Sequence, residues 1–376
     1  MTRRFRRRLL HIVSFVLAAG LLYLAFRSVD MQEVVAAFRA ADYRWVLPLV
    51  ALLIGANVLR AWRWQVMVDA LPDRALSDES PVAHTTKETK ETSRAPLDET
   101  FGALMVGYMV NYIAPRVGEV ARTVNLSART NVRFSSLFGT VVSERILDTA
   151  VLAGAVGSAF LLLLDRLPVL HEAILAPFWD RVAALPTVTI AWSVGGSGVV
   201  LLLLGYGLWR GLRNSRSFLR ALWNDTVQPA LVSFRDGMMT LITSPRRAVI
   251  FGSTVGMWGG YLLLAYLPFV MLNLAGPYDI SLLDAWILMA IGALGLLVPA
   301  PGGLGSYHYI TILALGLFYD MPEAEAATYA VLTHAAQMVF YTLAGLLTLA
   351  IQGATGERAL QTTTPVPDDG GASVPS

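Results

Sequence analysis

Long uninterrupted runs of apolar residues dominate this sequence and limit the folds that it can adopt. The first run, residues 9–26, has no charged side chain and follows five arginines. Only 15% of the 376 residues are charged, whereas soluble domains average about 25%. A helix needs about 20 apolar residues to cross a bilayer, and runs of about this length recur along the chain. The sequence therefore predicts an all-α polytopic membrane protein.

The apolar runs fall into a long and a short class, which predict two kinds of membrane segment. The long runs, predicted to be full spans, are 9–26, 45–66, 136–164, 188–209, 249–272 and 328–352. The short runs are 101–115, 283–298 and 304–318. Short apolar segments more often enter the membrane and return on the same side. We therefore expect about six full spans plus two short re-entrant or broken helical hairpins, within 101–133 and 283–318.

The distribution of basic residues predicts on which side of the membrane each loop lies. Short cytoplasmic loops hold the excess of Lys and Arg. With the N-terminus in the cytoplasm, the cytoplasmic segments hold 23 basic residues, the outer loops hold 5, and Arg145 lies inside a span. This split predicts a multi-pass protein of the cell membrane with both termini in the cytoplasm.

Polar segments are few and short. Residues 69–100 are rich in Thr, Ser and Glu and are predicted to form a disordered cytoplasmic loop, and the tail 357–376 is predicted to be disordered as well. The remaining chain, 1–356, is predicted to be one integral membrane domain. Residues 210–248 fit either an amphipathic helix on the inner leaflet or a plain basic loop.

Ionisable residues inside apolar segments are the first candidates for function, because each costs at least about 2.5–3.5 kcal/mol at the centre of a membrane helix. Arg60 and Arg63 lie at the end of the second span, and their spacing of three places both guanidiniums on one helix face. At the cytoplasmic headgroup level they would bind a lipid phosphate bidentately. Alternatively, they anchor the span by extending to the membrane surface beside Trp62 and Trp64.

A second polar cluster surrounds a break in the first short segment. It comprises Asn111, Arg116, Glu119 and Arg122. The break, at Pro115 and Gly118, frees backbone groups that need partners. A pair between Glu119 and Arg122, or a lipid headgroup, would supply them. Alternatively, the cluster is a capped turn at the membrane interface.

A third cluster, Glu144, Arg145 and Asp148, lies near the start of the third long run. Glu144 and Asp148 are four residues apart, so they share one helix face and repel each other unless they are paired or protonated. Arg145 points elsewhere on the helix. The expected partners are therefore Arg116, Arg122, or a cation or proton of the substrate. The alternative is a purely structural buried network.

A backbone break interrupts 35 residues, 285–319, that contain no Asp, Glu, Lys or Arg. It consists of two prolines and three glycines: Pro299, Pro301, Gly302, Gly303 and Gly305. Glycines before a new helix present free N–H groups, which we expect to bind an anion such as a lipid phosphate. His308 follows in that helix, and His334 lies in the last span. Each histidine either titrates near neutral pH or is a hydrogen-bonded packing residue.

The composition argues against several kinds of chemistry. There are no cysteines, and no His/Asp/Glu set has the spacing of metal ligands, so neither a metal nor another cofactor is expected. No nucleophile–base set is found, so an enzyme is not expected, and no nucleic-acid partner is expected either. The expected partners are membrane phospholipids, anionic or aminoacylated, with a second copy of the chain or a transferase as further candidates.

Four motifs occur in an order that resembles a known family. They are Leu59–Trp64 (LRAWRW), Pro115–Glu119 (PRVGE), Glu144–Asp148 (ERILD) and Pro299–Gly305 (PAPGGLG). Over about residues 9–352 this succession resembles the flippase-like membrane domain of lysylphosphatidylglycerol synthases and their stand-alone relatives. The resemblance implies a polytopic domain of bacteria or archaea that, in the synthases, moves the aminoacylated lipid across the bilayer.

The sequence departs from the family pattern at two positions. Many members carry an acidic residue shortly after the Pro-Gly-Gly break, where this chain has Tyr307 and His308. Many members also carry Arg in the last span near the position of His334. The soluble synthase domain has no counterpart, since no soluble segment exceeds about 40 residues. Synthase activity is therefore not expected.

Three functions agree with these observations. The leading one is a membrane lipid translocase that moves an anionic or zwitterionic headgroup between leaflets. The second is an intramembrane enzyme that acts on a lipid-linked substrate, with Glu144 or Asp148 as general base. The third is a membrane accessory protein for lipid or glycosyl transfer, without transport activity of its own.

Overall fold

The computed structural model describes residues 3–76, 94–114, 117–166, 228–296 and 300–363, with a few isolated positions outside these ranges. The helices are α1 Arg3–Phe26, α2 Met31–Ala40, η1 Tyr43–Trp45, α3 Val46–Asp69, η2 Asp73–Ala75, α4 Leu97–Ile113, α5 Gly118–Arg129, α6 Phe134–Leu162, η4 Leu164–Arg166, α11 Gln228–Thr243, α12 Arg247–Met271, α13 Leu282–Gly295, η7 Pro301–Gly303, α14 Ser306–Tyr319 and α15 Glu323–Thr363. No β-strand occurs in these ranges, where Leu76 and Val132 form an isolated bridge. The all-α prediction is confirmed.

Long apolar helices correspond to most of the predicted spans. Four segments in the described ranges are long and apolar enough to cross a membrane: Tyr43–Asp69, Phe134–Leu162, Arg247–Met271 and Glu323–Ala354. The pair α1 and α2 is a fifth candidate, bent by 79° between the two helices. The sixth predicted span, 188–209, lies outside the described residues, as does most of the predicted loop 69–100. A polytopic membrane protein is therefore confirmed.

Both predicted hairpins are present. Helices α4 and α5 pack together, and Arg129 at the end of α5 donates from Nη2 to Oε1 of Glu99 near the start of α4, at 2.6 Å. Helices α13 and α14 also pack together, and Tyr319 at the end of α14 donates to Asp284 near the start of α13, at 2.9 Å. In each hairpin the end of the second helix therefore lies beside the start of the first helix.

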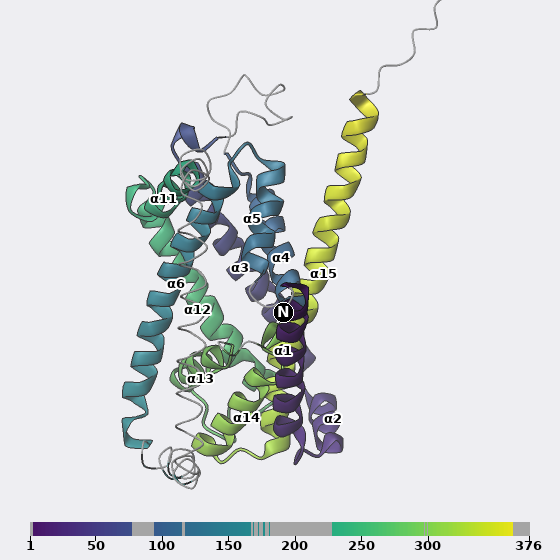
Figure 1. Ribbon diagram of the computed structural model, residues 1–376. Helices are drawn as coiled ribbons and strands as arrows, with labels where there is room; N and C mark the ends of the chain where they lie inside the picture. Colours follow the sequence, from purple (N-terminus) through teal and green to yellow (C-terminus); the bar gives the residue numbers. More distant parts are fainter. Residues whose placement is uncertain are drawn as a thin grey trace, which may run out of the picture.

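The hairpins occupy opposite halves of the molecule and meet at their tips (Figure 1). Helix α4 packs on the C-terminal half of α15, where Met109 lies against Gly345, whereas α14 packs near Thr333 in the N-terminal half. At the tips, the ring of Tyr112 lies against Gly302. Gly302 has a φ of +57° and no room for a Cβ, so this contact requires glycine.

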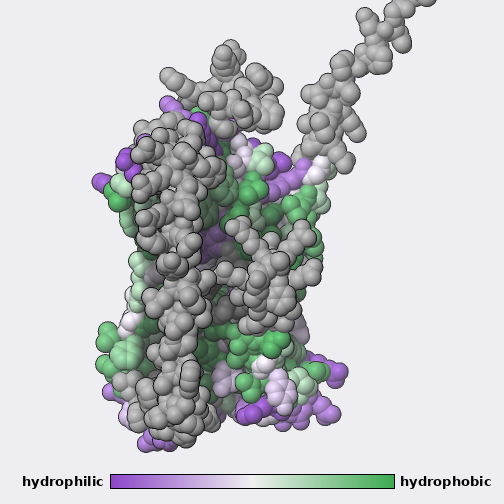
Figure 2. All heavy atoms as spheres, in the orientation of Figure 1, coloured by the Kyte–Doolittle hydropathy of each residue, from purple (hydrophilic) through white to green (hydrophobic). Residues whose placement is uncertain are grey.

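The outer surface of the described helices is largely apolar. Figure 2 shows hydrophobic residues along the visible face and hydrophilic residues mainly near the two ends. Large apolar side chains are exposed on several helices, among them Leu47 on α3, Val255 on α12 and Leu347 on α15. Extended exposed apolar surface of this kind marks a membrane contact.

Part of the segment 210–248 forms α11, which packs along α6 (Figure 1). Gly139 of α6 and Gly237 of α11 face each other, because a Cβ added to Gly237 would meet the backbone oxygen of Ser136 and, at 2.9 Å, the Cα of Gly139. The two glycines thus let the helix backbones touch. A plain basic loop is therefore wrong for residues 228–243, and residues 210–227 lie outside the described ranges.

A methyl group added at the contact between α6 and α11 should destabilise the protein. In Gly237→Ala the Cβ meets backbone atoms, so the helices must separate, which costs about 1–3 kcal/mol. Gly154→Ala is the matched control, since a Cβ there meets nothing within 4 Å and alanine favours a helix more than glycine. Thermal unfolding in detergent should give a lower Tm for Gly237→Ala only. Equal Tm values for the two variants would contradict this packing.

Candidate functional site

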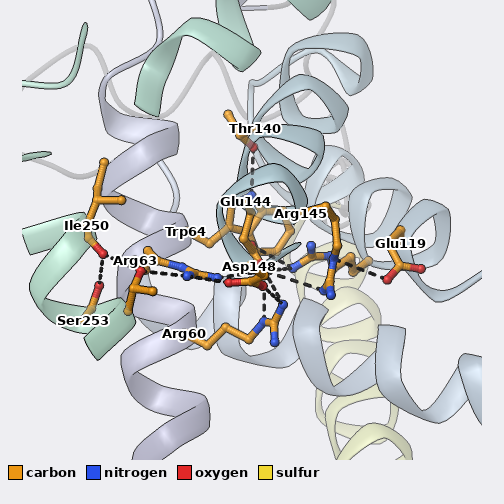
Figure 3. Close-up of polar contacts among 12 residues, drawn as sticks. Arg60, Arg63, Trp64, Glu119, Thr140, Glu144, Arg145, Asp148, Ile250 and Ser253 are labelled. Atoms are coloured by element: carbon orange, nitrogen blue, oxygen red, sulfur yellow. Dashed lines mark hydrogen bonds and ion pairs between the residues drawn. The ribbon is translucent and has the colours of Figure 1, made fainter. Parts of the chain in front are cut away.

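A fully buried carboxylate, that of Glu144 in α6, is the centre of the candidate site. Its Oε1 accepts hydrogen bonds from Nε and Nη2 of Arg60, at 2.9 and 2.6 Å. Nη2 of Arg63 lies 3.3 Å from the same oxygen, and Nη1 of Arg122 lies 3.2 Å from Oε2. Figure 3 shows Arg60 and Arg63 pointing toward Glu144 from α3. One carboxylate therefore connects α3, α5 and α6.

Asp148, one turn further along α6, adds a second carboxylate to this ion network. Its Oδ2 lies 2.8 Å from Nη2 of Arg60, and its Oδ1 lies 2.8 Å from Nη1 of Arg63. The spacing of four on α6 and the spacing of three on α3 place both carboxylates opposite both guanidiniums. Two carboxylates tolerate this proximity because positive charges lie between them.

Helix α12 provides hydroxyl groups that accept hydrogen bonds from the two arginines of α3. Nη1 of Arg63 donates to Oγ1 of Thr254 at 2.9 Å, and Nη1 of Arg60 donates to the hydroxyl of Tyr261 at 3.3 Å. Each guanidinium thus contacts both carboxylates and a hydroxyl. The network is therefore fixed by side chains from four helices.

Arg122 contacts one carboxylate, whereas Arg60 and Arg63 contact two each. Its guanidinium lies 4.8 Å from the centre of the Trp64 ring, at a distance suited to a cation–π contact. Trp64 is itself fixed, since Nε1 donates to Thr140 at 2.9 Å. Nε and Nη2 of Arg122 have no hydrogen-bond partner among the described residues. Two donor groups of this guanidinium are therefore unsatisfied in the described ranges.

The ion network lies inside the apolar part of the helices and not at their ends. Arg60 is nine residues from the end of α3 at Asp69, about 13 Å along the helix, and Glu144 is ten residues from the start of α6, about 15 Å. Arg60 and Arg63 are buried. The alternative in which they extend to the membrane surface as anchors is therefore wrong, whereas their binding of a lipid phosphate stays a prediction. The carboxylates of α6 give them partners inside the protein.

The network has more positive than negative charge. It contains the guanidiniums of Arg60, Arg63, Arg122 and Arg145 and the carboxylates of Glu119, Glu144 and Asp148. Among the described residues, four against three leaves a net charge of +1. Buried charge without compensation is costly in a low-dielectric interior, so the site fits an anionic ligand. In the described ranges, no group of three or more His, Asp or Glu side chains is placed to hold a metal ion.

The ion pairs on α5 differ from the predicted ones. Glu119 pairs with Arg145, with Oε1 3.6 Å from Nε, and Arg122 pairs with Glu144. The predicted pair between Glu119 and Arg122 is replaced because each side chain meets a partner on α6. The expectation that Arg122 neutralises Glu144 agrees with the structure. The expectation that Arg145 points elsewhere is wrong, because its Nη2 lies 3.7 Å from Oε1 of Glu144.

The break between α4 and α5 is closed by a side chain. Oδ1 of Asn111 accepts a hydrogen bond from the backbone N–H of Gly118 at 2.8 Å. Gly118 leaves no room for a Cβ, because the backbone oxygen of Gly107 lies against it. Asn111 is therefore a structural cap in this arrangement. Pro115 and Arg116 lie outside the described residues.

The glycines of the second break make room for neighbouring helices. A Cβ at Gly303 would meet the side chain of Leu296, and a Cβ at Gly305 would meet the backbone of α1, with Leu22 N at 2.7 Å. Like Gly302, both have a positive φ. The three glycines serve close packing, and the prediction that they cradle an anion finds no support in this geometry.

The second break also brings two histidines together. Pro301 is buried at the start of η7, and Pro299 lies outside the described residues. Nε2 of His334 lies 2.8 Å from the carbonyl oxygen of Gly302. The rings of His308 and His334 are 4.9 Å apart between centroids. Two positions that the sequence treats separately are therefore neighbours.

Sequence reasoning missed a row of aromatic side chains between the ion network and the second break. The ring of Tyr108 lies 5.8 Å from the guanidinium of Arg60 and stacks on Tyr341, with centroids 4.3 Å apart. Tyr112 follows one turn later on α4, and its centroid is 6.2 Å from that of His334. The spacing of four between Tyr108 and Tyr112 was the available signal, since it places both rings on one face of α4.

The sequence model described as "Lysylphosphatidylglycerol synthase TM region" matches residues 11–345 of the chain. The chain belongs to this family. The match to the lysylphosphatidylglycerol synthase TM region includes the whole ion network and both hairpins, and it confirms the resemblance carried by the four motifs.

A curated relative extends the comparison. This member of the lysylphosphatidylglycerol synthase TM family is 22% identical to "Glycosyltransferase AglD" of Haloferax volcanii over 360 residues, which cover 91% of this chain and 54% of that protein. The chain therefore spans about half the length of the curated relative that it matches. No solved structure matches the chain.

Removing the central negative charge should destabilise the protein more than removing the neighbouring one. Glu144→Gln leaves three guanidiniums with the carboxylate of Asp148, and loss of one partner from a buried pair costs about 3–5 kcal/mol. Asp148→Asn should cost less, because the Asp148 side chain is 13% exposed and contacts two guanidiniums. Thermal unfolding in one detergent measures the order of the two Tm values.

A double variant tests the charge balance directly. Because Glu144 is the carboxylate that contacts Arg122, the variant Glu144→Gln with Arg122→Gln should recover part of the Tm that Glu144→Gln loses. Strictly additive losses would contradict the coupling between these two residues.

Proposed function

We propose that this chain moves a lipid with a negatively charged headgroup between the two leaflets of the membrane. The observation that carries the proposal is the ion network around Glu144, which is buried, lies inside the apolar part of the helices and has one more guanidinium than carboxylate. Guanidiniums bind phosphate oxygens bidentately. A lipid phosphate would balance the excess charge at a depth where water is scarce.

Arg122 is the residue proposed to contact the headgroup. Arg60 and Arg63 are each held by both carboxylates, whereas Arg122 contacts Glu144 and the Trp64 ring. The N–H groups at Nε and Nη2 of both Arg63 and Arg122 are buried without a hydrogen-bond partner in the described ranges, but Nη2 of Arg63 lies 3.3 Å from Oε1 of Glu144 in an ion pair. Donors of this kind gain most from a charged acceptor.

The two hairpins supply a route for the headgroup. Non-helical backbone inside a membrane persists only where protein or a water-filled space shields it. Broken segments in opposite halves that meet near the middle are typical of secondary transporters. Here the tips meet at Tyr112 and Gly302, and Tyr108 and Tyr112 lead from Arg60 toward this contact. The acyl chains would remain in the surrounding lipid while the headgroup follows the polar side chains.

The carboxylates are poorly suited to act as bases in an intramembrane enzyme. Both Glu144 and Asp148 accept bonds from guanidiniums, which stabilise the charged carboxylate and occupy the oxygens that would take a proton. The geometry therefore favours binding of an anion over proton transfer by these two groups.

A second candidate function is a membrane domain that holds a lipid-linked sugar for a transferase. The similarity to a protein named as a glycosyltransferase favours it. The phosphate of such a lipid would occupy the same position beside Arg122. The two candidates differ in outcome, since one releases the lipid in the other leaflet and the other retains it for reaction.

Purified protein in unilamellar vesicles should accelerate the movement of a fluorescent anionic phospholipid between leaflets, measured by bleaching the outer leaflet with a reductant. Arg122→Gln should slow this movement by at least about tenfold, because a hydrogen bond to a charged group contributes about 1.5–3 kcal/mol. Arg44→Gln is the matched control, since the Arg44 side chain is 90% exposed, and it should leave the rate unchanged.

The outcomes separate the candidates. Folded protein that accelerates no lipid, whether anionic or zwitterionic, contradicts translocation. Acceleration that does not depend on Arg122 rejects the proposed site. An anionic lipid that co-purifies with the protein, is lost in Arg122→Gln and is not moved across vesicles favours the second candidate.

A further inference from the structure

Two buried histidines lie in contact where the hairpins meet. The side chains of His308 on α14 and His334 on α15 are both more than nine-tenths buried, and their ring centroids are 4.9 Å apart. Nε2 of His334 lies 2.8 Å from the carbonyl oxygen of Gly302. Because a carbonyl only accepts, this nitrogen is the donor. Nδ1 of His308 is buried without a hydrogen-bond partner among the described residues.

The side chains around the pair are aromatic and uncharged. Phe26 of α1 lies 5.7 Å from His308, and Tyr307 of α14 lies 5.5 Å from His334, between ring centroids. Tyr112 of α4 lies 6.2 Å from His334. Helix η7 contributes the Gly302 carbonyl. No Asp or Glu in the described ranges forms an ion pair with either imidazole. Tyr112 and Tyr307 are the titratable groups that face the pair.

A positive charge is poorly accommodated in these surroundings. An imidazolium there would be buried beside a second imidazole without a carboxylate to balance it. Proton uptake therefore favours an arrangement in which at least one ring reaches water. Two neutral rings favour the closed contact between the hairpin tips. His334 then donates to the Gly302 carbonyl, and the ring of Tyr112 lies against that same glycine.

We propose that His308 and His334 form a proton-binding site that controls the contact between the two hairpins. The proton binds at the unprotonated nitrogen of His308 or at Nδ1 of His334. Neutral imidazoles hold the tips together, and a proton on either ring separates Gly302 from Tyr112. A proton that binds the separated arrangement more tightly shifts the population toward it. This inference concerns the tips alone and does not rest on lipid movement.

Distances between spin labels on the two tips test the proposal. The chain has no cysteine, so Ile113→Cys with Leu296→Cys introduces two unique thiols. Both native side chains are exposed, at 68% and 52%, and a nitroxide at either position avoids the core. Electron–electron double resonance on the full chain in lipid nanodiscs, at pH 8 and pH 5, gives the distance distribution. We expect a population of longer distances that grows at pH 5.

Two histidine variants serve as controls. His308→Phe with His334→Gln removes both imidazoles while Gln keeps a donor for the Gly302 carbonyl, and the distance distribution of this variant should not change with pH. Changing the chain's other three histidines, His11, His84 and His171, to Gln should leave the pH response intact.

A second measurement follows the proton itself. Nuclear magnetic resonance on protein with 15N-labelled histidine, assigned with the same variants, should show that His308 or His334 titrates between pH 8 and pH 5. The proposal is overturned by a parent protein whose tip distance does not change with pH, by the same change in His308→Phe with His334→Gln, or by two rings that take up no proton in this range.

Discussion

The rest of the structure depends on the carboxylate of Glu144. This group is bonded to two arginines of α3 and one of α5, so two long helices and one short helix share one negative charge. A buried charge without a partner costs several kcal/mol, so the arginines can lie at this depth only because the carboxylate lies there too. The requirement is mutual, and it specifies how α3 packs against α6, because a shift of one residue along either helix would turn the bonded groups away from each other.

The choice of arginine is part of the same constraint. The sequence has 29 basic residues, of which 2 are lysines, and both lysines lie in the polar segment 69–100. A guanidinium stays charged in an apolar environment and offers five N–H donors, so Arg60 binds both carboxylates and a tyrosine hydroxyl at once. An ammonium on a flexible stem has three donors and a compact charge, which fits a network of this geometry less well.

The sequence predicts the structural features that follow from the thickness of the bilayer. Span lengths and the two hairpins follow from the lengths of apolar runs, because a membrane imposes a minimum length on every helix that crosses it. The pairing of Glu144 with Arg122 also follows, since a buried charge needs a partner. The pairing of Arg60 and Arg63 with the carboxylates of α6 was missed, because their spacing shows that they share a face but not which helix that face meets. The contact between His308 and His334 was missed for the same reason.

Helix α15 gives the hairpins a connection to the region beyond the membrane. It has 41 residues and is therefore about 60 Å long, roughly twice the thickness of the hydrocarbon core. One half contacts α14 and the other half contacts α4, while the last turns continue past both. A stiff helix supported in this way behaves as a lever. A small tilt about Gly345 would displace Thr363, about 27 Å further along the axis, by several ångström. A rearrangement of the hairpins would thus become a mechanical signal at the end of α15.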